Sequence, residues 1–294
     1  MTSRTWVGGG NNNASNPNNW SPSGVPVPGD ALSMLSGTMN VRDNNLAGNT
    51  LGVGAGQTQS TVTLNLSRHA GVSLDIAQFS DDQVTVNATG SDTLNVNTEF
   101  PSTLAMTVNL ADNAKLTGAF TMTFGGVTLD GGTGSRFVNN GLSHFGVGGS
   151  DAVLDTDVRG NGTFDVSTAQ SFAGNLEFGG AVSHGQTIDV RGDPGRDLPS
   201  HIRVDQPDAF HGLVNLNIFG ELDLQGLANA DSYTFQNDML SIYSGDTVLD
   251  TVRLTAPPSP IPGNFDLAVY QTPTGVAVDR GAVPPGGTLL PVHA

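Results

Sequence analysis

The sequence predicts an all-β protein whose main part is a parallel β-solenoid, or β-helix, with about 22 residues per coil. Short segments that alternate apolar and polar residues recur in the middle of the chain and begin at residues 62, 72, 84, 94, 106 and 127. Every second segment follows the last by 22, 22 and 21 residues, the fixed period of stacked strands. Gly, Asn and Asp stand between the segments, where each coil has to turn.

The composition agrees with this fold. Of the 294 residues 39 are Gly, aromatic residues make up only 6% and charged residues 13%. A solenoid core is narrow, so small aliphatic side chains fill it better than large rings. A disordered chain would be richer in charge and poorer in Val, Leu and Ile. The length suits one large β domain or two smaller ones.

Residues 1–30 are expected to form an N-terminal cap. They contain both tryptophans of the chain, Trp6 and Trp20, among many Gly, Asn and Pro residues. A bare terminal coil is an unpaired sheet edge, so a solenoid needs a cap at its end. Packing of the two rings inside the cap is the simpler interpretation, and stacking of an exposed ring on a sugar is the alternative.

Residues 31–230 are expected to form the solenoid itself. The first coil, over residues 31–60, is irregular, and the repeat is clearest over residues 60–130. Beyond residue 130 the strand-like segments continue at looser spacing, at 152–154, 164–166, 176–178, 188–190, 202–204, 214–218 and 222–224. At this period, residues 60–225 give roughly seven coils.

Residues 231–280 are expected to form a C-terminal β-hairpin module. Residues 233–243 and 247–254 alternate in polarity around a Ser-Gly-Asp turn, which predicts one hairpin. A second hairpin is expected from residues 265–270 and 276–278 around a Pro-Thr-Gly turn. The Pro- and Gly-rich residues 281–294 are expected to be a flexible arm.

Both ends of the chain suggest self-assembly. The terminal segments either seal the solenoid or join it to the next copy, and an arm that carries apolar residues favours joining by strand addition. Head-to-tail contacts of this type do not close, so they generate filaments. The expected interface residues are Trp6, Trp20, Leu289, Leu290 and Val292.

Two stretches resemble parts of known proteins. The opening resembles the head of bacterial extracellular β-helix surface proteins, including autotransporter-type adhesin passengers, through Trp6, Gly8, Gly9, Asn19, Trp20, Pro26, Gly29 and Asp30. Residues 237–246 are similar to the ending of secreted surface proteins of alphaproteobacterial type. The resemblance implies a secreted or cell-surface location. We expect a different export route, since no translocator domain accompanies the passenger-like repeats.

The charge balance excludes several classes of partner. The chain has 27 acidic residues against 11 basic ones, a formal charge of −16, and Lys115 is its only lysine. A nucleic-acid or anionic-membrane binder needs a basic face, which this chain cannot build. The absence of Cys excludes a disulfide-built module. No stretch approaches the roughly 18 apolar residues of a transmembrane helix, so no transmembrane segment is expected.

Catalysis is the alternative to a structural role, and residues 184–211 are its best candidate site. The stretch contains three of the six histidines together with several acids and arginines. Alternation would bring a carboxylate pair and an arginine onto one strand face, as a polysaccharide lyase or glycosidase requires. A polar loop held by Arg–Asp pairs is the simpler interpretation, and we expect no turnover of polyuronates. The candidate catalytic residues are Asp189, Arg191, Asp193 and Asp197.

Calcium is the candidate cofactor. Of the 27 acids only three are Glu, which leaves 24 Asp, and Asp is both a turn residue and a ligand of hard cations. The calcium-binding nonapeptide repeat is incomplete here, because Arg136 stands where its Asp should be. Turn capping is the alternative role for these acids. The candidate ligands are Asp81, Asp82, Asp151, Asp155 and Asp157.

The sequence therefore favours a secreted structural protein, a subunit of a surface layer, fibre, adhesin or biofilm matrix that assembles with itself or adheres to a polysaccharide. Repeats dominate the chain, reactive residues are sparse, and Asn, Thr and Gly on the outer faces suit lateral packing. The alternatives are a β-helix enzyme that acts on polysaccharides and a passive glycan-binding module.

Overall fold

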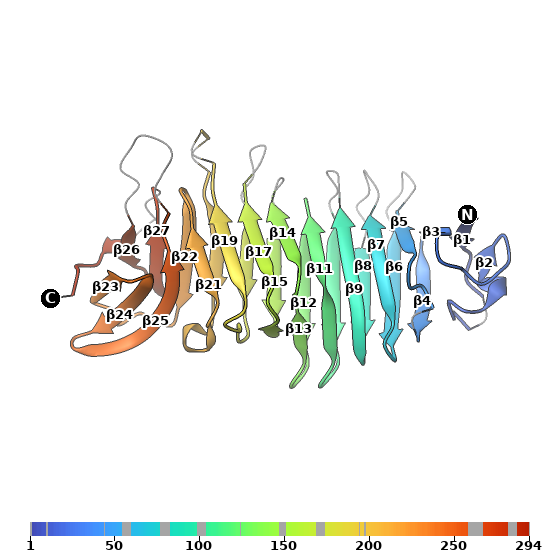
Figure 1. Ribbon diagram of the computed structural model, residues 1–294, viewed down its shortest axis with the longest axis horizontal. Helices are drawn as coiled ribbons and strands as arrows, with labels where there is room; N and C mark the ends of the chain where they lie inside the picture. The colour runs from blue at the N-terminus through green and yellow to red at the C-terminus, as the bar shows by residue number, and fades with distance from the viewer. Residues whose placement is uncertain are drawn as a thin grey trace. The chain divides into compact units, whose positions relative to one another are not determined.

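The computed structural model describes residues 2–9, 11–43, 45–54, 60–76, 83–98, 104–123, 125–146, 151–168, 174–193, 195–196, 198–257, 267–281 and 287–293. Parallel strands stack in coils about 23 residues apart and form a β-solenoid of about 7 turns, which confirms the predicted fold (Figure 1). The chain divides into two units, Met1–Ser143 and His144–Ala294. The described residues form no helix that is long and apolar enough to span a membrane.

Unit 1 is built from two sheets of parallel strands. One sheet contains β1 (Ser3–Trp6), β3 (Ala31–Met34), β5 (Thr50–Val53), β7 (Gly71–Ile76), β9 (Ser91–Thr98) and β11 (Lys115–Met122), with β2 (Trp20–Ser21) antiparallel to β1 and β13 (Arg136–Val138) beside β11. The other contains β4 (Gly37–Arg42), β6 (Thr61–Ser67), β8 (Gln83–Ala88), β10 (Ala105–Leu110) and β12 (Gly126–Gly131).

The register of unit 1 follows the period of its sequence. Val62 pairs with Val84, Val84 with Met106, and Met106 with Val127. Side chains on a strand point alternately to its two faces, so these apolar residues all enter the core. Leu64 and Val108, two residues further along their strands, are fully buried.

The N-terminal segment of unit 1 packs against the first coils as a cap. The Trp6 and Trp20 rings are buried and meet edge to face, with their centroids 5.2 Å apart. The Trp20 indole Nε1 donates a hydrogen bond to the Ala14 carbonyl oxygen at 2.8 Å. The backbone NH of Ala14 in turn donates to the carbonyl of Asn40 on the edge strand β4. The two rings therefore stabilise the cap from inside and offer no exposed surface for stacking on a sugar or a neighbouring subunit.

Unit 2 repeats the arrangement with looser coils. One sheet runs β14 (Leu142–Gly146), β17 (Thr163–Ser167), β19 (Thr187–Arg191), β21 (Leu213–Leu216), β25 (Thr247–Thr255), β24 (Met239–Ser244) and β23 (Ser232–Gln236). The other runs β15 (Asp151–Asp155), β18 (Asn175–Phe178), β20 (Ser200–Val204), β22 (Gly220–Gln225), β27 (Gly275–Asp279), β26 (Ala268–Gln271) and β28 (Thr288–Leu289). The short strand β16 (Asp157–Arg159) lies between β15 and β17 in the sequence.

Phenylalanine rings fill the core of unit 2. The rings of Phe145 and Phe164 are stacked 6.4 Å apart, and Phe164 meets Phe178 edge to face at 5.4 Å. Phe178 in turn lies 5.8 Å from Phe210. Phe145 and Phe210 belong to the coils on either side of the one that contains Phe164 and Phe178, so the aromatic contacts cross the core within one coil and tie it to both neighbouring coils.

The C-terminal module differs from the sequence prediction in one turn. Residues 233–243 were expected to be one strand, but Asn237 and Asp238 have φ angles of 52° and 58° and form a turn between β23 and β24. The local reason is that Asn and Asp adopt this left-handed conformation more readily than most residues. The result is a three-stranded antiparallel meander, β23–β24–β25.

The described end of the chain, residues 287–293, folds back onto its own unit. Strand β28 pairs antiparallel with β26, and the His293 ring stacks on Tyr243 with centroids 4.1 Å apart. Leu290 is buried in this contact, whereas Leu289 and Val292 are exposed. These contacts differ from the flexible arm expected over residues 281–294, because the terminal strand finds its partner within the same chain.

Candidate functional site: an acidic groove on unit 2

The stretch predicted to hold a catalytic site is divided between different faces of unit 2. Asp189 and Arg191 lie on β19, whereas His201 and Arg203 lie on β20 in the other sheet. His184 and His211 stack on each other at a third position, with ring centroids 4.6 Å apart. The chain crosses from one sheet to the other between residues 191 and 200, so neighbours in sequence are separated in space.

One of these faces forms a groove. The groove has a volume of about 400 Å³ and lies over the outward side of β15, β18, β20 and β22. Its side chains stand in two in-register rows. The first row consists of Asp151, Asn175, His201 and Glu221. The second begins with the apolar Val153 and continues with Glu177, Arg203 and Asp223. Because parallel pairing aligns equivalent residues of successive coils, these side chains repeat at the strand spacing of about 4.8 Å.

Hydrogen bonds fix the polar side chains of the groove. Asn175 Nδ2 donates to Asp151 Oδ1 at 2.7 Å, and His201 Nδ1 lies 3.0 Å from Glu221 Oε2. Arg203 Nε donates to Asp205 Oδ1 at 2.8 Å, while another nitrogen of the same guanidinium lies 3.9 Å from Glu177 Oε2. Contacts within the protein therefore restrain the side chains of both rows.

Burial changes the acidity of two carboxyl groups in the groove. Partial burial raises the pKa of Glu177, and Arg203 opposes that shift only in part. Burial also raises the pKa of Asp223, and the neighbouring negative charge of Glu221 adds to the effect. Both groups hold a proton more tightly than a free carboxyl group does.

The groove is thus acidic and rich in hydrogen-bonding groups. Four carboxyl groups line it, those of Asp151, Glu177, Glu221 and Asp223, against one guanidinium group. Such a surface accepts hydrogen bonds from hydroxyl groups and attracts ammonium groups. A carboxyl group with a raised pKa beside an ionised one is also the pattern of an acid–base pair.

The predicted residues Asp189 and Arg191 line a separate hollow on the other sheet, with a volume of about 480 Å³. There Asp189 accepts a hydrogen bond from Asn215, and His144 Nδ1 lies 2.9 Å from Asp165 Oδ2 in the same sheet.

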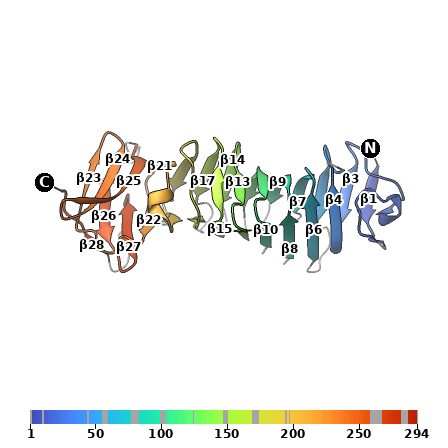
Figure 2. The same cartoon turned by 90° about the horizontal axis from the view of Figure 1, so that it is seen from below.

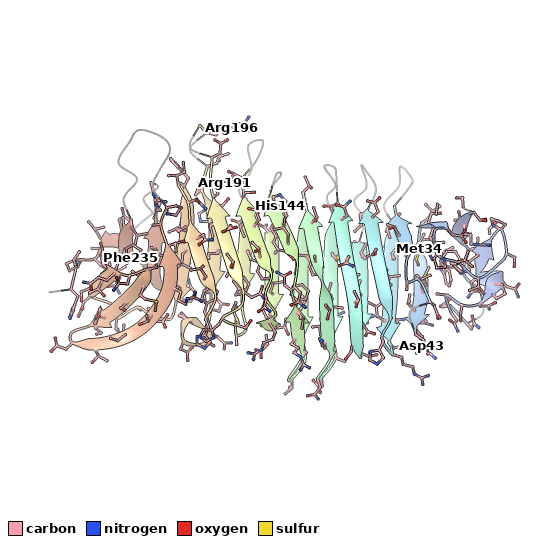
Figure 3. The ribbon with its side chains drawn as sticks, in the orientation of Figure 1. Met34, Asp43, His144, Arg191, Arg196 and Phe235 are labelled. Carbon is pink, nitrogen blue, oxygen red and sulfur yellow. The ribbon has the colours of Figure 1, made fainter. Side chains whose placement is uncertain are left out.

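Asp193 does not share this face, because β19 ends at Arg191 and the chain turns away. Figure 3 shows Arg191 at that strand end and Arg196 on the loop beyond it, where Arg196 lies 3.8 Å from Asp193. Asp197 lies outside the described residues.

The candidate calcium ligands do not come together as a set. Asp151 lines the groove and Asp157 binds Arg159 at 2.9 Å, while Asp155 ends strand β15. Asp81 and Asp82 lie outside the described residues. Within the ranges that the structure describes, no group of three or more His, Asp or Glu side chains is placed to hold a metal ion.

Sequence reasoning missed three of the groove residues, Glu177, Glu221 and Asp223. One signal was available, since two of the three Glu residues of the chain lie in this groove. Their register, however, depends on coils that advance by 26 and then 20 residues, from Glu177 to Arg203 to Asp223. A fixed period of 22 does not align them.

Comparison with known proteins adds no further relationship. The fold class is established by the structure alone as a β-solenoid of the β-helix type. No protein-family model matches this chain, and neither a curated protein nor a solved structure does.

Proposed function

We propose that this protein is a secreted structural protein of the bacterial surface, an adhesive β-solenoid that binds a polysaccharide in the acidic groove of unit 2 and does not cleave it. The observation that supports this role is the pair of in-register polar rows across β15, β18, β20 and β22. Rows of hydrogen-bonding groups at a regular spacing suit a ligand that is itself a repeating, hydroxyl-rich polymer. The two rows run across the four strands, which suits binding along a polymer chain that crosses them.

The charge of the groove narrows the class of polysaccharide. Four carboxyl groups against one guanidinium group repel polyuronates and other acidic polymers. Neutral sugars, and amino sugars whose ammonium groups pair with carboxylates, fit better. Arg203 is already engaged by Asp205 and lies near Glu177, so it is poorly placed to recruit an anionic sugar.

The ends of the solenoid favour adhesion over head-to-tail assembly. In unit 1, residues 12–14 hydrogen-bond to the edge strand β4, and in unit 2 the antiparallel strand β27 covers β22. Covered edges resist strand addition from another copy. Sedimentation over a range of concentrations distinguishes adhesion by single molecules from head-to-tail assembly. Filament growth that depends on residues 281–294 would favour assembly.

The surface location rests on the sequence resemblance to autotransporter-type adhesin passengers. Its residues include Trp6, Gly8 and Trp20, which belong to the N-terminal cap. Digestion of the protein by a protease added to intact cells tests this location, with a cytoplasmic protein as the control.

Binding of purified full-length protein to immobilised neutral, amino and acidic polysaccharides tests the groove. Glu221→Gln and His201→Ala should weaken binding to a neutral or amino polysaccharide, because the first removes the charge from the pair whose atoms lie 3.0 Å apart and the second removes the ring itself. Asp189→Asn is the matched control, since it removes one negative charge from the other hollow of the same unit. Equal losses in all three variants, or a preference for acidic polymers, would contradict the proposal.

A glycosidase is the second candidate, and the raised pKa of Glu177 is the observation that favours it. A protonated Glu177 would act as the general acid, with an ionised carboxylate of the groove opposite it. Release of new reducing ends from a bound polysaccharide, lost in Glu177→Gln with binding intact, would establish the enzyme and exclude the passive role.

A further inference from the structure

A regular array of Thr and Asn covers the outward face of one sheet in unit 1. The strands β4, β6, β8, β10 and β12 pair in parallel, and Figure 2 shows β4, β6, β8 and β10 side by side. The array consists of one row of Thr38, Thr63, Thr85, Thr107 and Thr128 and a second row of Asn40, Asn65, Asn87, Asn109 and Asp130, both in register.

The Asn row is fixed by its own hydrogen bonds. The last three amides each donate to the side-chain oxygen of the previous coil, at 2.8 Å from Asn65 to Asn40, 2.9 Å from Asn87 to Asn65 and 2.8 Å from Asn109 to Asn87. This ladder uses one donor and one acceptor of each inner amide and leaves the others for the solvent side. The amides are therefore held at fixed positions and orientations.

The Thr row is rigid for a different reason. A β-branched side chain on a strand has few accessible rotamers, which restricts the positions of the hydroxyl and methyl groups of each Thr. The two rows are about 6.6 Å apart along the strand, and neighbouring coils are about 4.8 Å apart. The face is thus a two-dimensional lattice of hydroxyl, methyl and amide groups.

The array is nearly uncharged, although the chain as a whole carries a formal charge of −16. Its rows contain a single charged residue, Asp130, at their last position. A charged partner has little to recognise on such a face. A second copy of the chain is a poor occupant as well, because two strongly acidic molecules repel each other.

We propose that this Thr/Asn face binds ice. An ice crystal presents an uncharged lattice of donors and acceptors, and its repeats along two crystal axes are comparable with the two spacings of the array. The hydroxyl and amide groups would take the places of lattice waters, while the methyl groups order the water between them. Preformed side-chain positions keep the entropic cost of this match small.

This inference is independent of the polysaccharide groove, which lies in the other unit. The test measures thermal hysteresis of the full-length protein, the gap between melting and freezing temperatures of a single ice crystal, and its uptake into a growing ice front. Wild type should show both effects. Thr85→Tyr, at the centre of the array, should lose most of the hysteresis, because the ring holds the crystal away from the neighbouring rows.

Thr93→Tyr is the matched control. Thr93 is exposed on β9, the strand of the other sheet that follows β8, so the same substitution there should leave hysteresis and ice uptake unchanged. Thermal unfolding of both variants checks that the fold is intact, and Thr107→Tyr replaces Thr85→Tyr if that variant does not fold. Exclusion of the wild type from ice, or equal losses in the array and control variants, would overturn the proposal. Binding of the face to crystalline cellulose or chitin without any effect on ice would also overturn it.

Discussion

The side-chain amide of Asn87 donates a hydrogen bond to Asn65 Oδ1 at 2.9 Å, across two residues that lie 22 positions apart in the sequence. Asn109 donates to Asn87 in the same way at 2.8 Å. Neither bond can form unless successive coils stack in register. The period of the sequence therefore aligns two sets of residues, the apolar side chains of the core and the Asn side chains of a hydrogen-bonded ladder on the outer face.

Replacement of Asn87 by Ala should destabilise unit 1 by about 1–3 kcal/mol, because it removes two ladder hydrogen bonds, each with a net contribution of about 0.5–1.5 kcal/mol. The free energy of unfolding from urea titration measures the effect. Thr93→Ala, on the other sheet, is the control, and the ladder has no stabilising role if both variants unfold at the same urea concentration.

Asp30 should make the N-terminal cap sensitive to acid. The backbone NH of Thr2 and the guanidinium group of Arg4 lower the pKa of this carboxyl group to about 2. A free Asp has a pKa of about 3.9, so the folded state binds this proton less tightly than the unfolded state does. The stabilisation is complete above about pH 4 and is lost as the pH falls to about 2. Asp30→Asn should weaken this acid dependence, as urea titrations across that range can measure; an unchanged dependence would contradict the assignment.

Asp223 should show the opposite pH dependence. Burial and Glu221 raise the pKa of its carboxyl group, so the ionised form destabilises the fold at neutral pH and the penalty disappears as the pH falls through that raised value. Within the described residues its buried Oδ1 has no hydrogen-bond partner. Asp223→Asn should raise the melting temperature at neutral pH and have a smaller effect in mild acid. A gain of the same size in Asp189→Asn would indicate a general charge effect instead.

Gly118 should not tolerate a side chain. A Cβ at this position would lie 1.8 Å from the carbonyl oxygen of Leu94 on the neighbouring strand, so the sheet would have to shift. Overpacking of this kind costs about 1–3 kcal/mol. Gly118→Ala should lower the melting temperature, whereas Gly141→Ala, whose nearest neighbour is the Ala119 Cβ at 3.7 Å, should have little effect. Similar melting temperatures would show that the sheet accommodates the methyl group without strain.

The part of the fold that could be predicted is the part where local pattern and period agree. Leu64 and Val108 alternate with polar residues and recur at the coil period, so their burial follows from the sequence. The turn at Asn237 and Asp238 was missed although the alternation changes phase there, from Tyr233 and Phe235 to Leu240 and Ile242. A shift of one residue in the phase of the alternation marks the place where the chain reverses.

The candidate site could be predicted only in part, for the same reason. Asp189 and Arg191 were recognised by their residue types and do line one hollow together. Glu177, Arg203 and Asp223 come from three coils of unequal length, and only strand pairing aligns them. A constant number of residues per coil can be read from a sequence. Where coils differ in length, the residues that become neighbours are known only once the strand pairing is known.

The sequence by itself determined the class of fold, the coil period and the acidic character of the molecule, because alternation, repetition and charge are properties of the chain. The tertiary structure decided which polar residues meet. It buried Trp6 and Trp20 inside the cap and brought His201 to Glu221, and it paired the terminal strand with β26. The physical reason is that stacking brings together residues one coil apart, and where coil lengths vary that partner is fixed only by the backbone hydrogen bonds of the assembled sheet.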